Sequence, residues 1–409
     1  MFVSANDIHM AVGDLYLLVA AGNTSQILWI VGAILAVLVV NSVCKYITYD
    51  TAPARLIYKP SSWNRRLLAA MDTLPGTYYP TPYMVHDALQ TLFVAIGRLQ
   101  PKLPSRDEPF EVEPGEIIHL TWIEPEGAFG ADSTVPIVFV LHGVDGNAGK
   151  AYNRHMAKLI WKEGWRCVLP TRRGCNPAIA NQKSYEYYDP DFALVVRHVA
   201  AAFPRAKLYA IGMSAGANIV TKYAGMTGTE CPLSGAVSVG NGYDWDEGTQ
   251  HLSKRWIWNY IIMYTSRRQF YYKHEELYTD PGSPLHGRVC PRAMASVRGF
   301  RDFDTHFSSR LHEYDDVESY YQAQSCKHNM RDIAIPMLFL HTEDDPLCPP
   351  ALIPFNLIYH NPQLMLAITN RGGHLGWAKG WLPFAASSST WGEEVAADYV
   401  KALVRMHSD

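Results

Sequence analysis

The chain has 409 residues, enough for one large domain or two small ones, and 48% of them are hydrophobic, so it can bury a sizeable core. A formal net charge of −3 gives no reason to expect nucleic acid as a partner. Its 7 cysteines are odd in number and scattered along the chain, so we expect reduced thiols and no disulfide framework.

An apolar run lies near the N-terminus. Residues 27–43 read ILWIVGAILAVLVVNSV, and their flanks extend the run to about residues 27–47, which is long enough to span a bilayer. We predict an N-terminal segment, residues 1–49, with an uncleaved membrane anchor. A buried core helix is the alternative, and a cleaved signal peptide is disfavoured because the first 26 residues hold no lysine or arginine.

The charges around this run predict its orientation. Only acidic charges precede the run, whereas several lysines and arginines follow it. The positive-inside rule then places the bulk of the chain in the cytoplasm, behind a single membrane pass. The endoplasmic reticulum is our guess for the host membrane.

Residues 50–115 are irregular and rich in proline and aromatic residues. Within them, the stretch MVHDALQTLFVAIGRL, residues 84–99, has apolar residues at helical spacing. We predict an amphipathic helix here, packed on the main domain through its apolar face: Val85, Leu89, Leu92, Ile96 and Leu99.

Strands and helices then alternate to the end of the chain. Residues 117–122 read as an edge strand, and apolar runs typical of strands buried on both faces occur at residues 135–143, 165–174, 208–213, 233–241, 336–345 and 364–374. Helical patterns occur at residues 151–164, 191–203 and 391–406 and directly after the strand at 208–213. This order predicts an α/β fold with a doubly wound, mostly parallel sheet, in one domain that covers residues 50–409.

One stretch, about residues 243–333, interrupts this alternation because it contains no convincing strand. Aromatic residues are frequent in it: Trp256, Trp258, Tyr260, Tyr264, Phe270, Tyr271 and Tyr272. We predict a helical insertion that acts as a lid over a site. The alternative is an ordinary helical excursion packed by its own aromatic residues.

The stretch GMSAG, residues 212–216, lies where a predicted strand turns into a predicted helix. A turn this sharp holds its central residue in a strained backbone conformation, and the flanking glycines leave the space it needs. The Gly-x-Ser-x-Gly motif is weak by itself, but in this setting it projects the hydroxyl of Ser214 above the sheet edge. We therefore expect Ser214 to be a nucleophile.

Partners for this serine are sought at the carboxyl ends of the strands, where chemistry gathers in open α/β sheets. The strand at 336–345 ends in Asp344 and Asp345, and the strand at 364–374 ends in His374. An imidazole can take the serine proton at neutral pH, and a carboxylate can hold the imidazole in the required tautomer. We predict His374 as the base and Asp345 as the acid, with Asp344 as the alternative acid.

A tetrahedral oxyanion needs backbone N–H donors. We expect them from Ala215, which follows the nucleophile, and from Val144, which follows a strand-end His-Gly pair. The chain contains no His-Glu-x-x-His motif and no clustered Cys/His spacing, so we expect neither a metal nor a cofactor.

Several motifs together resemble a known family. The stretches VLHGVDGNAG, PTRRGCN, GMSAGAN, HTEDDPLCPP and RGGHLGW resemble α/β-hydrolases of the ABHD1/ABHD3 type, which are related to the YheT and EMB8 proteins. The resemblance covers about residues 55–405 and implies the α/β-hydrolase fold, often with an N-terminal membrane anchor. It also implies the roles of nucleophile, acid and base for Ser214, Asp345 and His374, and a supporting role for the Arg173-Gly174 loop.

Members of this family include lipid and fatty-ester hydrolases, some phospholipases and ester-forming acyltransferases. We therefore predict a membrane-anchored serine hydrolase that cleaves carboxylic esters, above all acyl lipids, through an acyl-enzyme on Ser214. An acyltransferase with the same triad and a non-catalytic binding protein of the same fold are the alternatives. The expected partners are an acyl-ester substrate and the bilayer, and the sequence leaves the oligomeric state open.

Overall fold

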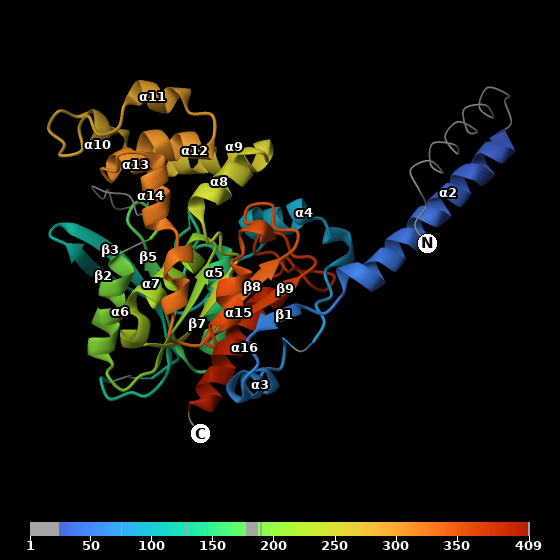
Figure 1. The fold of residues 1–409 in the computed structure, drawn as a ribbon, viewed down its shortest axis with the longest axis horizontal. Helices are drawn as coiled ribbons and strands as arrows, with labels where there is room; N and C mark the ends of the chain where they lie inside the picture. The colour runs from blue at the N-terminus through green and yellow to red at the C-terminus, as the bar shows by residue number, and fades with distance from the viewer. Residues whose placement is uncertain are drawn as a thin grey trace. The chain divides into compact units, whose positions relative to one another are not determined.

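The computed structural model describes residues 24–74, 76–127, 130–144, 146–176, 187–188 and 190–407 (Figure 1). The chain divides into two units, Met1–Ala52 and Pro53–Asp409. The first unit contains helix α2 (Thr24–Lys45), which continues as the π-helical turn η1 (Tyr46–Asp50). Within it, Val31–Asp50 is apolar and long enough to cross a membrane, by length and composition. This helix fits the predicted anchor, whereas residues 1–23 lie outside the described part.

The second unit is built on one nine-stranded sheet with the order β1-β9-β8-β7-β6-β4-β5-β3-β2. Strands β4 to β9 pair in parallel with one another, whereas β1, β2 and β3 add antiparallel edges. The predicted α/β fold with a mostly parallel sheet is therefore confirmed. The strands are β1 (Arg55–Tyr58), β2 (Arg106–Glu113), β3 (Glu116–Ile123), β4 (Ile137–Leu141), β5 (Arg166–Thr171), β6 (Leu208–Met213), β7 (Leu233–Val239), β8 (Met337–Thr342) and β9 (Leu364–Thr369).

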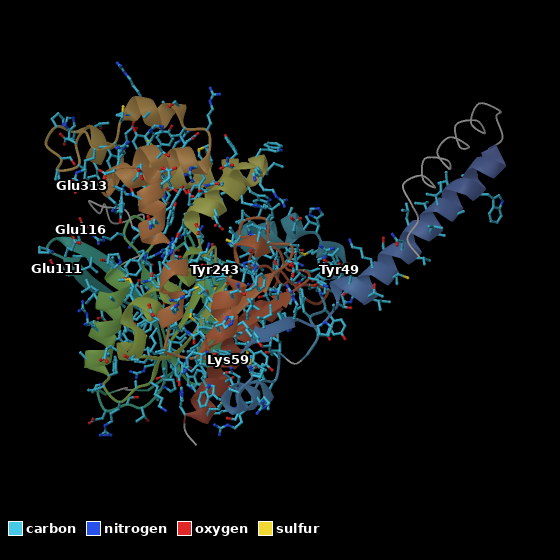
Figure 2. All side chains as sticks on the ribbon, in the orientation of Figure 1. Tyr49, Lys59, Glu111, Glu116, Tyr243 and Glu313 are labelled. Carbon is cyan, nitrogen blue, oxygen red and sulfur yellow. The ribbon has the colours of Figure 1, made fainter. Side chains whose placement is uncertain are left out.

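Two edge strands were not predicted. Strand β1 is short, and β2 is strongly polar and mostly exposed. Figure 2 shows Glu111 and Glu116 on the hairpin that β2 forms with β3. Neither strand has the continuous apolar pattern of a buried strand, because an edge strand has a neighbour on one side only.

Helices cover both faces of the sheet. They are α3 (Ser62–Ala69), α5 (Ala151–Lys162), α6 (Asp191–Ala202), α7 (Ala215–Thr227), α15 (Phe355–His360) and α16 (Trp391–Met406), whereas α4 (Asp87–Leu92) belongs to the segment before β2. Successive side chains of a strand point to opposite faces. On β4, Phe139 belongs to the apolar cluster shared with α6 and α7, whereas Val138 belongs to the one shared with α5 and α16. Burial on both faces explains why these strands are continuous apolar runs.

The insertion between β7 and β8 contains helices joined by loops and no strand. Its helices are α8 (Trp245–Ser253), α9 (Trp256–Ser266), α10 (Glu275–Thr279), α11 (Pro291–Ser296), α12 (Phe300–Phe303), α13 (Ser309–Leu311) and α14 (Val317–Gln324). They share a third apolar cluster, which is rich in aromatic residues. Val144, after β4, and Leu347, after β8, pack against this cluster. The insertion therefore lies over the carboxyl ends of the strands, beyond one end of the sheet in Figure 1.

The segment predicted as one amphipathic helix differs from the prediction. It consists of α4 followed by a π-helical turn, η3 (Phe93–Gly97), which changes the helical phase. The prediction that its apolar face packs on the domain is wrong, because four of the five residues are 39% to 83% exposed: Leu89, Leu92, Ile96 and Leu99. The buried side instead carries Gln90, Thr91, Phe93 and Val94.

Candidate active site

Ser214 occupies the turn between β6 and α7 in a left-handed backbone conformation, with φ 55° and ψ −119°. Few residues other than glycine adopt a positive φ, so the strain expected at this position is present. The flanking glycines are tightly packed. A Cβ at Gly212 would lie 2.2 Å from the carbonyl oxygen of Gly216, and a Cβ at Gly216 would lie 2.4 Å from that of Leu141.

The three predicted side chains meet at the carboxyl ends of β6, β8 and β9. The Nε2 atom of His374 lies 2.9 Å from the Oγ atom of Ser214. Its Nδ1 atom lies 2.8 Å from Oδ2 of Asp345. These distances are those of hydrogen bonds, so one continuous chain of hydrogen bonds joins serine, imidazole and carboxylate. His374 and Asp345 are both buried.

Asp345 is held by its own turn as well as by the imidazole. Its Oδ1 atom accepts hydrogen bonds from the backbone N–H groups of Leu347 and Cys348, both at 2.8 Å. Burial by itself would raise the pKa of Asp345, but the neighbouring His374 and these hydrogen bonds outweigh it and hold the pKa below its usual range. The carboxylate is therefore ionised at neutral pH and fixed in orientation.

Asp344 makes different contacts from its neighbour. Its Oδ1 atom accepts a hydrogen bond from the backbone N–H of Gly373 at 2.9 Å, and its Oδ2 atom lies 3.5 Å from the guanidinium of Arg371. Burial raises the pKa of Asp344 to about 6. Asp344 thus contacts the backbone of Gly373, the residue before His374, whereas Asp345 contacts the imidazole of His374 itself.

Two threonines also hold the loop that carries His374. The Oγ1 atom of Thr91, on α4, accepts a hydrogen bond from the backbone N–H of His374 at 3.0 Å. The hydroxyl of Thr342 donates to the carbonyl oxygen of Gly373, also at 3.0 Å. No pattern in the sequence marks Thr91, because the apolar spacing around it predicts that the opposite side of α4 is buried.

The two predicted oxyanion donors belong to segments next to Ser214. Ala215 is the first residue of α7, where backbone N–H groups have no partner within the helix. The loop after β4 approaches from the other side, since a Cβ at Gly143 would lie 3.3 Å from the Cβ of Ser214. Val144 follows directly and lines the same pocket as the serine.

A pocket of about 390 Å³ opens beside Ser214 and His374. Its walls come from α4 and η3, the loop after β4, the start of α5, and α9 of the insertion. Most lining residues are apolar, among them Leu92, Val94, Ile96, Trp258, Ile261, Ile262, Leu347 and Leu375. A pocket of this size and lining suits an apolar ligand with few polar groups.

A comparison with known families identifies the fold family of this chain. The family described as the alpha/beta hydrolase fold matches residues 136–376. The chain belongs to the alpha/beta hydrolase fold family. The predicted membership is therefore confirmed.

Relatives of this α/β-hydrolase extend over most of its length. It is 30% identical to the Embryogenesis-associated protein EMB8 of Picea glauca over 351 residues, which cover 83% of this chain and 75% of that protein. It is 26% identical to Phospholipase ABHD3 of Homo sapiens over 366 residues, 88% of this chain and 87% of that protein. It is also 26% identical to Monoacylglycerol lipase ABHD2 of Danio rerio over 391 residues, 91% of this chain and 88% of that protein.

The loop after β4 in this α/β-hydrolase is held by Arg172. Its buried guanidinium donates hydrogen bonds to the carbonyl oxygens of His142 and Gly143, at 3.0 and 2.6 Å. Burial and the nearby Arg172 cation lower the pKa of His142 well below its usual range, so this imidazole is neutral. Arg172 thus fixes the backbone that precedes Val144.

Arg173, which the family resemblance marks as support for the site, contacts the start of α6 in this α/β-hydrolase. Its guanidinium forms two hydrogen bonds, at 2.7 and 2.8 Å, with the carboxylate of Asp191 at the start of α6. Its neighbour Arg172 contacts the loop beside the serine instead.

Cys348 is a further neighbour of the hydrogen-bonded chain. Its Sγ atom and single ligand atoms of Asp345 and His374 lie within 4.8 Å of one another. Burial raises the pKa of the Cys348 thiol well above its usual range, and metals bind the thiolate, not the thiol. Asp345 and His374 are moreover engaged with each other, so we assign this α/β-hydrolase no metal here.

Proposed function

We propose that this α/β-hydrolase is a membrane-anchored serine hydrolase that cleaves acyl lipids through an acyl-enzyme on Ser214. The observation that carries the proposal is the hydrogen-bonded chain from Ser214 through His374 to Asp345. The enzyme class is that of carboxylic-ester hydrolases. Relatives whose names specify a phospholipase and a monoacylglycerol lipase support lipid esters as substrates.

Each residue of the site has its own role in the proposed reaction. His374 takes the proton of Ser214 as the hydroxyl oxygen attacks the ester carbonyl, and Asp345 stabilises the imidazolium that forms. The backbone N–H groups of Val144 and Ala215 bind the oxyanion of the tetrahedral intermediate. The imidazolium then protonates the departing alcohol. Water, activated by the same imidazole, releases the fatty acid and restores the serine.

The rest of the chain brings this chemistry to a membrane. We assign residues 1–49 to the anchor segment and residues 50–409 to the hydrolase domain, with the insertion at about 243–333 as its lid. Helix α2 is long and apolar enough for a single pass, and the basic residues after it favour a cytoplasmic domain. The lid assignment is supported by Trp258, Ile261 and Ile262 of α9, which form part of the pocket wall.

Trapping the acyl-enzyme tests the proposal. The purified full chain is mixed with phosphatidylcholine vesicles, quenched in acid and digested, and the peptide that contains Ser214 is weighed by mass spectrometry. We expect the mass of one fatty acyl group on this peptide and free fatty acid in solution. A fluorophosphonate probe should label the same serine, with the Ser214→Ala variant as the blank. Acyl groups or probe on another residue would contradict the mechanism.

The same reaction mixture separates hydrolysis from acyl transfer. Both start from the acyl-enzyme, but a transferase passes the acyl group to an alcohol. With glycerol or a fatty alcohol added, we expect free fatty acid to remain the main product. New ester as the main product would identify an acyltransferase, and a chain inert to every activated ester would favour the non-catalytic alternative.

Lys150 favours a phospholipid over a neutral acylglycerol. It lines the pocket with Ser214 and His374, and its ammonium group has no hydrogen bond or ion pair with the described residues. An ammonium group there can pair with the phosphate of a bound lipid.

Replacing this lysine tests the preference. For Lys150→Met we expect kcat/KM for phosphatidylcholine to fall about tenfold relative to kcat/KM for a monoacylglycerol, the loss of one charge-assisted hydrogen bond. Lys150 precedes α5, and the exposed Lys162 is the last residue of that helix. The variant Lys162→Met is the control and should leave this ratio unchanged. Equal losses on both lipids would mean that Lys150 does not recognise phosphate.

A further inference from the structure

Helix α9 has an apolar side that faces solvent. The exposed residues on it are Trp256 (76% exposed), Ile257 (49%), Tyr260 (56%), Ile261 (37%) and Tyr264 (46%). Their spacing places them along one side of the helix, while Met263 and Ser266 are buried on the other. A surface helix of a soluble domain normally carries polar residues on its solvent side. An apolar side in this position therefore calls for a non-aqueous surface that covers it.

The segment formed by α4 and η3 has a similar exposed side. Leu92, Ile96 and Leu99 are exposed there, in place of the buried face that their spacing predicts. An adjoining loop adds Trp381 and Leu382, which are 74% and 78% exposed. The backbone N–H of Leu99 donates to the carbonyl oxygen of Phe384 at 3.1 Å, so segment and loop are in contact.

These two apolar sides border the pocket that contains Ser214. Three exposed residues also belong to the pocket lining. They are Leu92 and Ile96 of the α4 and η3 segment and Ile261 of α9. An apolar surface therefore continues from the exterior to the serine. We call it the mouth surface and define it by Leu92, Ile96, Leu99, Trp256, Ile257, Tyr260, Ile261 and Tyr264.

The charges around α9 indicate what covers the mouth surface. Residues 254–274 contain no aspartate or glutamate, and they carry four exposed basic residues: Lys254, Arg255, Arg268 and Lys273. Trp and Tyr beside Lys and Arg are typical of segments that lie in the interface of a bilayer, where basic side chains meet anionic head groups. An interface with another protein does not require aromatic and basic residues side by side, so this combination favours a bilayer as the occupant.

We propose that the mouth surface inserts into the interfacial layer of the bilayer, so that an acyl lipid passes from the membrane into the pocket without crossing water. The inference rests on the proposed function for its substrate. The occupant is a bilayer that contains anionic lipid, bound by the apolar side of α9 and the segment of α4 and η3. The Trp and Tyr rings lie at head-group level, and the neighbouring basic residues contact phosphates.

Photocrosslinking of the full chain in vesicles of phosphatidylcholine and phosphatidylserine tests the insertion. p-Benzoylphenylalanine replaces Tyr260 in one variant and Tyr359 of α15 in another, which are 56% and 48% exposed. We expect at least about fivefold more lipid adduct at position 260 than at position 359. Equal adducts at the two positions, or adducts at 260 with a second protein copy instead of lipid, would overturn the proposal.

Activity gives a second readout. The double variant Trp256→Ser, Tyr260→Ser should hydrolyse phospholipid in vesicles about tenfold more slowly than the wild type, while hydrolysis of a water-soluble short-chain ester stays within about twofold. Tyr359→Ser is the control and should match the wild type on both substrates. A double variant as fast as the wild type on vesicles would overturn the proposal.

These outcomes are distinct from those of the proposed function. If the chain were no hydrolase, neither substrate would be cleaved, yet the lipid adducts at position 260 would still report insertion. If insertion were wrong, the soluble ester and the vesicle lipid would both still be cleaved, with no excess of adducts at position 260.

Discussion

Replacing Asp345 by asparagine is expected to lower kcat for ester hydrolysis by about 10⁴-fold, with KM nearly unchanged. The amide preserves the size of the side chain but removes the charge that stabilises the imidazolium of His374. Its NH₂ group also favours the wrong tautomer of the imidazole, because a donor then faces Nδ1. Initial rates on a short-chain ester, together with the thermal unfolding temperature of each variant, measure the effect.

Asp344→Asn is the matched comparison, and we expect it to lower kcat by less than about tenfold. The Oδ1 atom of an asparagine can still accept the hydrogen bond that Gly373 donates at 2.9 Å. Burial raises the pKa of Asp344 to about 6, which means that its surroundings favour the neutral form of the side chain. The neutral amide of asparagine therefore fits this position. A larger loss for Asp344→Asn than for Asp345→Asn would reverse the assignment of the acid.

Replacing Gly216 by alanine is expected to destabilise the fold by about 3 kcal/mol or more, which lowers the Tm by at least about 4 °C. The new Cβ would lie 2.4 Å from the carbonyl oxygen of Leu141 and 2.8 Å from that of His142. Both are backbone atoms, and β4 cannot move away because it is paired with β5 and β6 on its two sides. Calorimetry or thermal unfolding followed by circular dichroism measures the loss.

Gly130→Ala serves as the control for this substitution. A Cβ at Gly130 meets no heavy atom within 4 Å, and its backbone does not require glycine. We expect a change within about 0.5 kcal/mol. If Gly216→Ala unfolds at the temperature of the wild type, the close approach of β4 and α7 is not required, and the spatial reason for the glycine is wrong.

The central sheet and the triad geometry could be anticipated because their signals are local. Each strand from β4 to β9 is buried on both faces, so each is an uninterrupted apolar run. Short motifs at the ends of these runs carry Ser214, Asp345 and His374, and the ends of parallel strands meet at one edge of a sheet. The structure places the side chains within hydrogen-bonding distance at that edge.

The edge strands and the face of α4 were decided by tertiary contacts. Strand β1 pairs with β9, more than 300 residues later, and nothing within its own residues predicts that partner. The apolar spacing over residues 84–99 predicts a buried face. The opposite side faces inward instead, because of the π-helical turn and the hydrogen bond that the backbone N–H of His374 donates to Thr91.

The sequence by itself therefore determined the fold class, the order of the strands' apolar runs, and which serine, acids and histidine lie at the strand ends. Only the tertiary structure decided that Asp345 contacts the imidazole while Asp344 contacts the backbone of Gly373. It also decided that Arg172 holds the loop beside the serine and that apolar side chains border the pocket mouth. The physical reason is range. The burial pattern of a strand is visible in residues that are neighbours in the sequence. Which of two adjacent side chains contacts the imidazole instead depends on groups from distant parts of the chain.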